Sequence, residues 1–342
     1  MGAEKVKTEY DRPGVTKKVR ALGLTSGGLD STLAALILRD QGIEVEWVCF
    51  ETPFFSSRAA VKASDVTGIP VMVEDITDVF MTMLKNPRAG YGKYMNPCMD
   101  CHALMFARAG RIMEQSGFDF LFSGEVAGQR PKSQTRNAMG YVAKQSGFDR
   151  FILRPLSAGI LPESHVEKQG LVDRSRLSAL SGRSRKGQLQ MAKKLGLKEF
   201  PAPSGGCLLT DKGFSSRLRD LVFVQKKYEK RELYLLKHGR HIRLDEQTKV
   251  VVGRSEPDND HIMALYDKTW DVLLEPVNIP GPVMLVPGGA DETALKRAAS
   301  ICAGYTKIRP GRSAEIEIKG NGGYDRIIVP AADPADIKPF ML

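Results

Sequence analysis

The chain has 342 residues, 42% of them hydrophobic and 26% charged, which is typical of a folded globular protein and excludes a fibrous or wholly disordered one. Its length favours two domains, and no apolar run approaches the roughly 18 residues of a membrane span. The polar start lacks the apolar core of a signal peptide, so we expect a cytoplasmic protein with no membrane contact. The formal net charge of +10 favours a polyanionic partner, although charge alone is weak evidence.

Short apolar runs alternate with amphipathic stretches from residue 18 onward, which predicts an α/β domain whose parallel sheet carries helices on both faces. The predicted strands span 20–24, 44–50, 70–73, 119–122 and 151–153. The predicted helices span 31–41, 56–67, 102–115 and 134–145. Each helix is followed by a glycine that can adopt the positive φ which ends a helix at little cost: Gly42, Gly68, Gly117 and Gly147.

A glycine loop, Ser26-Gly27-Gly28-Leu29-Asp30-Ser31, joins the first predicted strand to the first predicted helix. Glycines let successive backbone amides converge on an anion, and the helix start adds free N–H groups and a positive dipole end. No Lys follows the second glycine as in a Walker A loop, and the spacing is not that of a dinucleotide site. We therefore expect a phosphate-binding loop of another kind; the alternative is an ordinary glycine turn.

The loop after the fourth predicted strand carries several polar side chains. Loops beyond the carboxyl ends of parallel strands form the ligand crevice of open α/β sheets, so this loop should face the glycine loop. Gly124, Glu125, Gln129 and Arg130 are therefore candidates for contacts with a nucleotide or a base, with Arg130 also suited to RNA. The alternative is a solvated loop of ordinary composition.

The cysteines fall into two groups. Cys98 and Cys101 form a C-x-x-C pair in a predicted loop before the third helix, and Cys207 lies about a hundred residues later. Three thiols suit a cluster or a redox pair, and His102 could complete a structural zinc site with them. Cys49 and Cys302 fall in apolar runs and are expected to be core residues.

Residues 159–213 form a predicted basic, helical connecting region that carries Cys207. Between 168 and 198 it holds nine Lys or Arg and one acidic residue, and Arg183, Arg185 and Lys186 would suit an RNA backbone, unless they are simply solvated. Residues 214–342 are predicted to form a smaller α+β domain, with strands at 243–253, 272–274 and 283–286, a helix at 292–303 and a hairpin of 314–318 with 326–329.

The loop Ser26–Ser31 resembles the SGGxDS loop of the PP-loop ATP pyrophosphatases. The resemblance implies a doubly wound domain over residues 1–158, of the adenine nucleotide alpha hydrolase-like kind, that binds ATP and transfers AMP to a carbonyl oxygen. It also implies that Asp30 helps to hold Mg²⁺ on the phosphates. The implied nucleotide contacts are Leu24, Ser26, Gly27, Gly28, Asp30, Ser31 and the backbone around Phe50, which would face adenine.

The string Asn96-Pro97-Cys98 with Cys101, followed by Gly206-Cys207, is similar to the cysteine pattern of the tRNA thiolases MnmA and ThiI. The resemblance implies one of two routes: a persulfide on one cysteine, or a 4Fe-4S cluster on Cys98, Cys101 and Cys207. We favour the cluster because a third cysteine is available. The C-terminal segments around 236–241 and 252–259 resemble the NFACT RNA-binding domain, which implies RNA contacts through Arg240 and Arg254.

The expected function is therefore that of an ATP-dependent tRNA sulfurtransferase, which adenylates a nucleobase carbonyl and replaces its oxygen with sulfur. Uridine is the nucleoside that we expect it to modify. Its partners would be tRNA and a sulfur donor, either sulfide or a persulfide carrier; whether it forms a homodimer is left open. Two alternatives stand beside it. One is a PP-loop enzyme that adenylates a small molecule, and the other is a non-catalytic RNA-binding protein with a structural metal.

Overall fold

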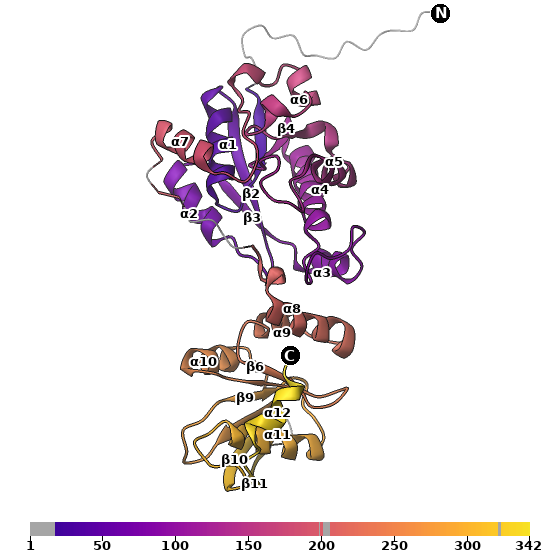
Figure 1. Ribbon diagram of the computed structural model, residues 1–342, viewed down its shortest axis with the longest axis vertical. Coiled ribbons are helices and arrows are strands. Elements are labelled where there is room, and N and C mark those ends of the chain that lie inside the picture. The colour runs from indigo at the N-terminus through magenta and orange to yellow at the C-terminus, as the bar shows by residue number, and fades with distance from the viewer. Residues whose placement is uncertain (1–17, 198, 201–205, 321–322) are drawn as a thin grey trace, which may run out of the picture.

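The computed structural model describes residues 18–197, 199–200, 206–320 and 323–342. Two lobes follow one another along the chain, each built around its own sheet, with helices α8 and α9 between them (Figure 1). No helix in these ranges is both long and apolar enough to cross a bilayer.

The first lobe is built on a parallel sheet of five strands in the order β3-β2-β1-β4-β5. Its strands confirm the predicted ones to within two residues, and the glycines at 42, 68, 117 and 147 all have positive φ. The bounds are β1 (Arg20–Leu24), β2 (Glu44–Glu51), β3 (Val71–Asp75), β4 (Phe120–Ser123) and β5 (Ile152–Leu153).

Helices cover both faces of this sheet, so the predicted doubly wound α/β architecture is confirmed. Successive strand residues point to opposite faces: Leu22 belongs to a core with α3, α4 and α5, whereas Ala21 belongs to a core with α1, α2 and α7. The bounds are α1 (Leu29–Asp40), α2 (Arg58–Thr67), α3 (Thr77–Lys85), α4 (Cys98–Ser116) and α5 (Arg136–Ser146).

The basic segment after residue 158 packs onto the first sheet. It contains two short helices, α6 (His165–Lys168) and α7 (Lys186–Lys194), joined by turns. Val166, Val172 and Ala192 are buried in the same core as Leu33 of α1. The side of the segment that faces the sheet is therefore apolar, and its Lys and Arg residues are left for the surface.

A buried apolar layer joins the two lobes. It comes from α8 (Lys212–Arg219), the π-helical turn Asp220–Gln225 and α9 (Lys230–Leu235). Phe214, where the sequence predicts the second domain to begin, packs edge-on against Phe54 with ring centroids 5.9 Å apart. A chain cut at this point would expose the first lobe's core, because Phe214 is buried within it.

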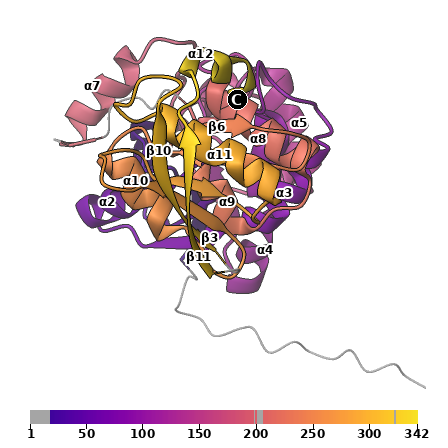
Figure 2. The ribbon, with the colours of Figure 1, turned by 90° about the horizontal axis from the view of Figure 1, so that it is seen from below.

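The second lobe has an antiparallel sheet of six strands in the order β11-β10-β8-β9-β7-β6, which confirms the predicted α+β character. Helices α11 (Glu292–Gly304) and α12 (Pro334–Ile337) cover one face, and α9 and α10 (Glu256–Ala264) pack on part of the other. Figure 2, the view from below, shows this lobe in front of the first. The strands are β6 (Arg240–Arg243), β7 (Lys249–Val252), β8 (Val272–Pro276), β9 (Met284–Val286), β10 (Ser313–Gly320) and β11 (Gly323–Pro330).

The single strand predicted over 243–253 is wrong, because two strands and a turn occupy this stretch. Arg243 pairs with Lys249 across a tight hairpin. The Asp245 carboxylate accepts hydrogen bonds from the backbone N–H groups of Gln247 and Thr248, at 2.9 and 2.7 Å. An aspartate that bonds to backbone two and three residues ahead stabilises a turn in place of continued strand.

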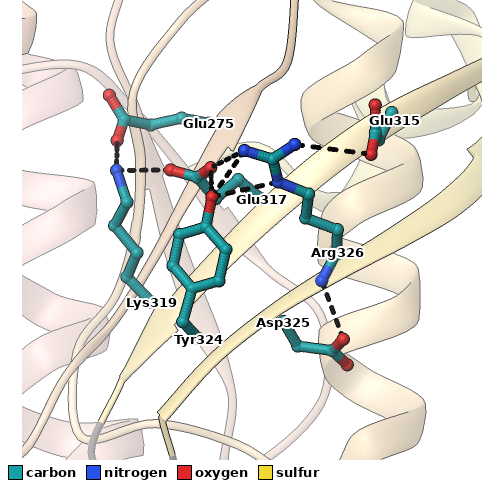
Figure 3. Close-up of polar contacts among 7 residues, drawn as sticks. All are labelled: Glu275, Glu315, Glu317, Lys319, Tyr324, Asp325 and Arg326. Carbon is teal, nitrogen blue, oxygen red and sulfur yellow. Dashed lines mark hydrogen bonds and ion pairs between the residues drawn. The ribbon is translucent and has the colours of Figure 1, made fainter.

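The outer hairpin, β10–β11, carries a polar network on the face opposite α11 (Figure 3). Lys319 lies 2.8 Å from Glu275 and 2.6 Å from Glu317, and Arg326 lies 3.1 Å from Glu317. Tyr324 also bonds to Glu317. The cations on this face are thus paired with carboxylates.

Candidate nucleotide and sulfur site

The glycine loop leaves β1 at Leu24 and enters α1 at Leu29. Gly27 has φ of 74°, and a Cβ at this position would lie 2.1 Å from the backbone of Ala59, so only glycine fits. The Gly27 N–H donates to Thr25 Oγ1, which lies 2.9 Å from Ser31 Oγ. No side chain caps α1, which leaves its first N–H groups free to bind an anion.

Asp30 is held from one side only. Its Oδ2 accepts a hydrogen bond of 2.8 Å from Gln129 Nε2, and Gln129 Oε1 accepts one of 3.0 Å from Gln188 Nε2. Its Oδ1 is buried and has no hydrogen-bond partner in the described part of the chain. An unsatisfied buried carboxylate oxygen is costly, and Mg²⁺ prefers oxygen ligands of this kind. The carboxylate therefore fits a magnesium site beside the loop.

Gln188 is expected to orient Asp30 through its hydrogen bond to Gln129. We expect Gln188→Leu to lower the apparent magnesium affinity in ATP-dependent AMP formation by about 10-fold, the low end of the usual effect of removing a residue that positions a metal ligand. Titrating Mg²⁺ at saturating ATP measures the shift. Gln190→Leu, at an exposed position of the same helix, is the matched control. An unchanged magnesium requirement in a folded Gln188→Leu protein would contradict the role.

The end of β4 lies directly against the glycine loop. A Cβ at Gly124 would lie 2.3 Å from the Ser31 nitrogen and 2.4 Å from the Asp30 carbonyl carbon, so glycine allows the two backbones to approach. Ser26 is exposed at this edge, whereas the Phe50 side chain is buried in the core at 4% exposure. At Phe50, a nucleotide could therefore contact the backbone but not the buried side chain.

Glu125 is buried and its carboxylate is fully engaged. It accepts hydrogen bonds from Arg154 Nε at 2.8 Å and lies 3.0 Å from His102 Nδ1. Burial alone would raise the pKa of Glu125, but Arg154 and His102 outweigh it and lower the pKa to about 2. Glu125 thus acts as a fixed anion that orients His102 and Arg154, and Arg154 is a residue that we did not predict from the sequence.

The structure brings the three cysteines of the predicted sulfur site together. Cys98 and Cys101 lie in the first turn of α4, so the predicted loop here is helical. The Leu208 N–H, next to Cys207, donates to the Phe54 carbonyl at 3.5 Å, beyond the end of β2. Burial raises the pKa of Cys101, and Cys207 and Cys98 raise it further. The three sulfurs therefore lie within electrostatic reach of one another, although 201–205, just before Cys207, lie outside the described residues.

No three His, Cys, Asp or Glu side chains among the described residues are arranged to hold a single metal ion. His102, the suggested fourth zinc ligand, turns Nδ1 toward Glu125. Thiolates around one zinc lie about 4 Å apart, given Zn–S bonds of about 2.3 Å. An iron–sulfur cluster spaces its thiolates more widely, because each binds a different iron. The donor set of three neighbouring thiols fits such a cluster.

The basic residues predicted to bind RNA lie in two places. Arg130 is exposed and close enough to Cys207 to act on its pKa, which burial raises and Arg130 lowers. The Gly182 N–H donates to the Ala127 carbonyl at 2.8 Å, which sets Arg183, Arg185 and Lys186 beside that same loop. Arg240 and Arg254 lie in the second lobe. Arg240 stacks over Tyr305 at 5.1 Å, and Arg254 is paired with Asp258 at 2.5 Å.

Two family models match separate parts of the chain. Residues 14–160 match the family described as thiamine biosynthesis protein (ThiI). Residues 239–341 match the NFACT protein RNA binding domain. The first match covers the parallel sheet, the glycine loop and the C-x-x-C pair, and the second covers all six strands of the antiparallel sheet.

Curated relatives resemble the first lobe. A tRNA-specific 2-thiouridylase MnmA of Sulfurimonas denitrificans is 33% identical over 120 residues, 32% of this chain and 35% of that protein. A probable tRNA sulfurtransferase of Halothermothrix orenii is 31% identical over 148 residues, 40% of this chain and 35% of that protein. The chain thus spans about a third of the length of these relatives.

Among solved structures, a 4-thiouridine synthetase in complex with RNA and ATP is 24% identical, with a TM-score of 0.34 and coverage of 52% of each chain. The resemblances predicted from the sequence are confirmed: the first lobe is similar to the ThiI family, and the second lobe to the NFACT RNA binding domain.

Proposed function

We propose that this protein is an ATP-dependent tRNA sulfurtransferase that replaces a nucleobase carbonyl oxygen with sulfur. The observation that carries the proposal is that the glycine loop and the segments bearing the three cysteines lie at the same edge of the parallel sheet. The glycine loop with the unsatisfied Asp30 oxygen follows β1. Helix α4, which carries Cys98 and Cys101, reaches the end of β4 through His102 and Glu125, and Leu208, next to Cys207, bonds to Phe54 beyond β2. The match to the ThiI family and the names of the curated relatives support the same chemistry.

In the first step the base carbonyl oxygen attacks the α-phosphate of ATP, and pyrophosphate leaves. The backbone from Ser26 to Ser31 would hold the phosphates, with Asp30 on Mg²⁺ and with Leu24, Gly124, Gln129 and the backbone at Phe50 around the nucleotide. Positioning and charge stabilisation supply most of the rate in such transfers. We propose uridine as the nucleoside.

In the second step sulfur bonds to the activated carbon, and AMP leaves with the former carbonyl oxygen. Cys98, Cys101 and Cys207 would hold a 4Fe-4S cluster, which would supply a coordination site for sulfide-level sulfur. The sulfur donor would be sulfide or a persulfide carrier. Arg130, which acts electrostatically on Cys207, would hold the RNA backbone while the base enters the site.

The tRNA would contact both lobes, through Arg183, Arg185 and Lys186 in the first and through Arg240 and Arg254 in the second. We retain residues 1–158 as the PP-loop domain, 159–213 as the connecting region and 214–342 as the RNA-binding domain. The packing of Phe214 on Phe54 attaches the last of these to the first.

Mass spectrometry of tRNA nucleosides from a deletion strain tests this function. We expect one thionucleoside to disappear and to return with the full-length gene. Purified protein should convert ATP to AMP and pyrophosphate only with unmodified tRNA. Turnover of ATP with a small acid or amide, and none with tRNA, would favour the small-molecule enzyme. Tight RNA binding without any ATP turnover would favour the non-catalytic protein.

A further inference from the structure

Three basic side chains lie at the seam between the lobes, and we call them the seam cluster: Arg58, Arg217 and Lys237. Arg58 is the first residue of α2, Arg217 lies in α8, and Lys237 follows α9. Burial and the nearby Arg58 charge lower the pKa of Lys237. Burial and Arg254 lower the pKa of Arg217. Cations from both lobes therefore repel one another here.

Packing fixes where the seam cluster lies. The first turn of α2 touches the glycine loop, since Ala59 lies against Gly27. Leu236, just before Lys237, is buried in the core that also holds Phe54. Helices α2 and α10, from different lobes, lie on the same side of the molecule in both views (Figures 1 and 2). The cluster thus lies between the antiparallel sheet of the second lobe and the glycine loop of the first.

The seam cluster lacks direct counter-charges. In the described ranges none of its members forms an ion pair; the neighbouring pairs are Lys230 with Asp75 and Arg254 with Asp258. Asp211 and Asp258 act on Arg217 only at a distance, and its buried Nε has no hydrogen-bond partner. The outer hairpin is different, because Lys319 and Arg326 contact glutamates there (Figure 3).

We propose that the seam is itself a tRNA-binding surface, where Arg58, Arg217 and Lys237 contact one continuous stretch of RNA backbone. This inference rests on the proposed function. Arg58 and Lys237 are exposed, and Arg217 is partly buried. Neighbouring cations without ion pairs repel one another in the free protein, whereas phosphates would neutralise them and release counterions. The seam would join Arg240 and Arg254 of the second lobe to Arg130 at the cysteines, which gives the RNA a basic route into the site.

Charge reversal tests the seam in the full-length protein. We expect Arg58→Glu with Lys237→Glu to weaken binding of an unmodified tRNA transcript at least about 10-fold near 0.1 M salt, and to reduce the slope of log affinity against log salt by about two. Fluorescence anisotropy across a salt series measures both. Arg111→Glu with Lys296→Glu, at exposed positions, makes the same change in net charge and should leave the slope unchanged.

The possible outcomes distinguish a failure of the seam proposal from a failure of the proposed sulfurtransferase function. Equal losses in the two double variants would show a general charge effect and overturn the seam, as would wild-type affinity in the Arg58 and Lys237 variant. Wild-type protein that binds no tRNA would instead overturn the proposed function. A separate readout excludes a structural role: Lys237→Gln should not lower the melting temperature, because it removes repulsion between Lys237 and Arg58. A clear loss of stability would assign Lys237 to packing.

Discussion

Asp30→Asn should reduce tRNA-dependent AMP formation by about 10²- to 10³-fold, the usual effect of removing one group that stabilises developing charge. The asparagine keeps an oxygen that can accept the Gln129 hydrogen bond, so the fold of the loop should persist. What it removes is the negative charge next to the phosphates, and with it the ligand proposed for Mg²⁺. Single-turnover release of pyrophosphate from ATP in the presence of tRNA measures the loss.

The affinity of the same variant for tRNA should change by less than about twofold, because binding of RNA depends on contacts with its phosphates and Asp30 lies in the nucleotide loop. Asp65→Asn, at an exposed position of α2, is the matched control and should leave both quantities unchanged. Asp30→Ala should behave like Asp30→Asn in catalysis but also release Gln129. Full AMP formation by Asp30→Asn would contradict the assignment of the glycine loop to ATP.

The first lobe was readable from the sequence because its determinants are local. Strands buried on both faces are short apolar runs, and glycines with positive φ mark the ends of the helices. Two local signals were nevertheless missed. Apolar residues stand at Ile76, just before α3, and at Phe80 and Leu84 within it, which is a helical spacing. The start of α4 follows Pro97 directly, a residue that fits the beginning of a helix.

The connections within the candidate site could not be read from the sequence. Gln129 lies 99 residues from Asp30, and Gln188 lies 59 residues from Gln129. Neither glutamine stands in a pattern that points to the other. The same holds for Arg154, which reaches Glu125 from the end of another strand. It holds as well for Arg58 and Lys237, which come within electrostatic reach of each other because α8 and α9 pack into the first lobe's core. A sequence names the candidate residues, but packing decides which of them touch.

Substitution of the three cysteines is expected to have the other large effect, a loss of thiolation. Cys98→Ser, Cys101→Ser and Cys207→Ser should each lower thiolation by at least about 10³-fold, while AMP formation falls by less than about 10-fold, because the thiols act after adenylation in a separate step. Cys49→Ala and Cys302→Ala are the controls. Their side chains are 2% and 0% exposed, so they should cost stability on the order of 1 kcal/mol and leave thiolation intact.

Metal content distinguishes the three chemistries open to these thiols. If three thiolates hold one cluster, anaerobically purified protein should be brown and contain iron and labile sulfide, and each Ser variant should lose both, since every thiolate binds a different iron. A persulfide route instead gives colourless, active protein, with a disulfide trapped between Cys207 and Cys98 or Cys101. A zinc site gives stoichiometric zinc and catalysis that survives loss of a thiol once the fold is restored. Full thiolation by anaerobic protein without iron would exclude the cluster, and the trapped disulfide would then identify which cysteine carries the sulfur.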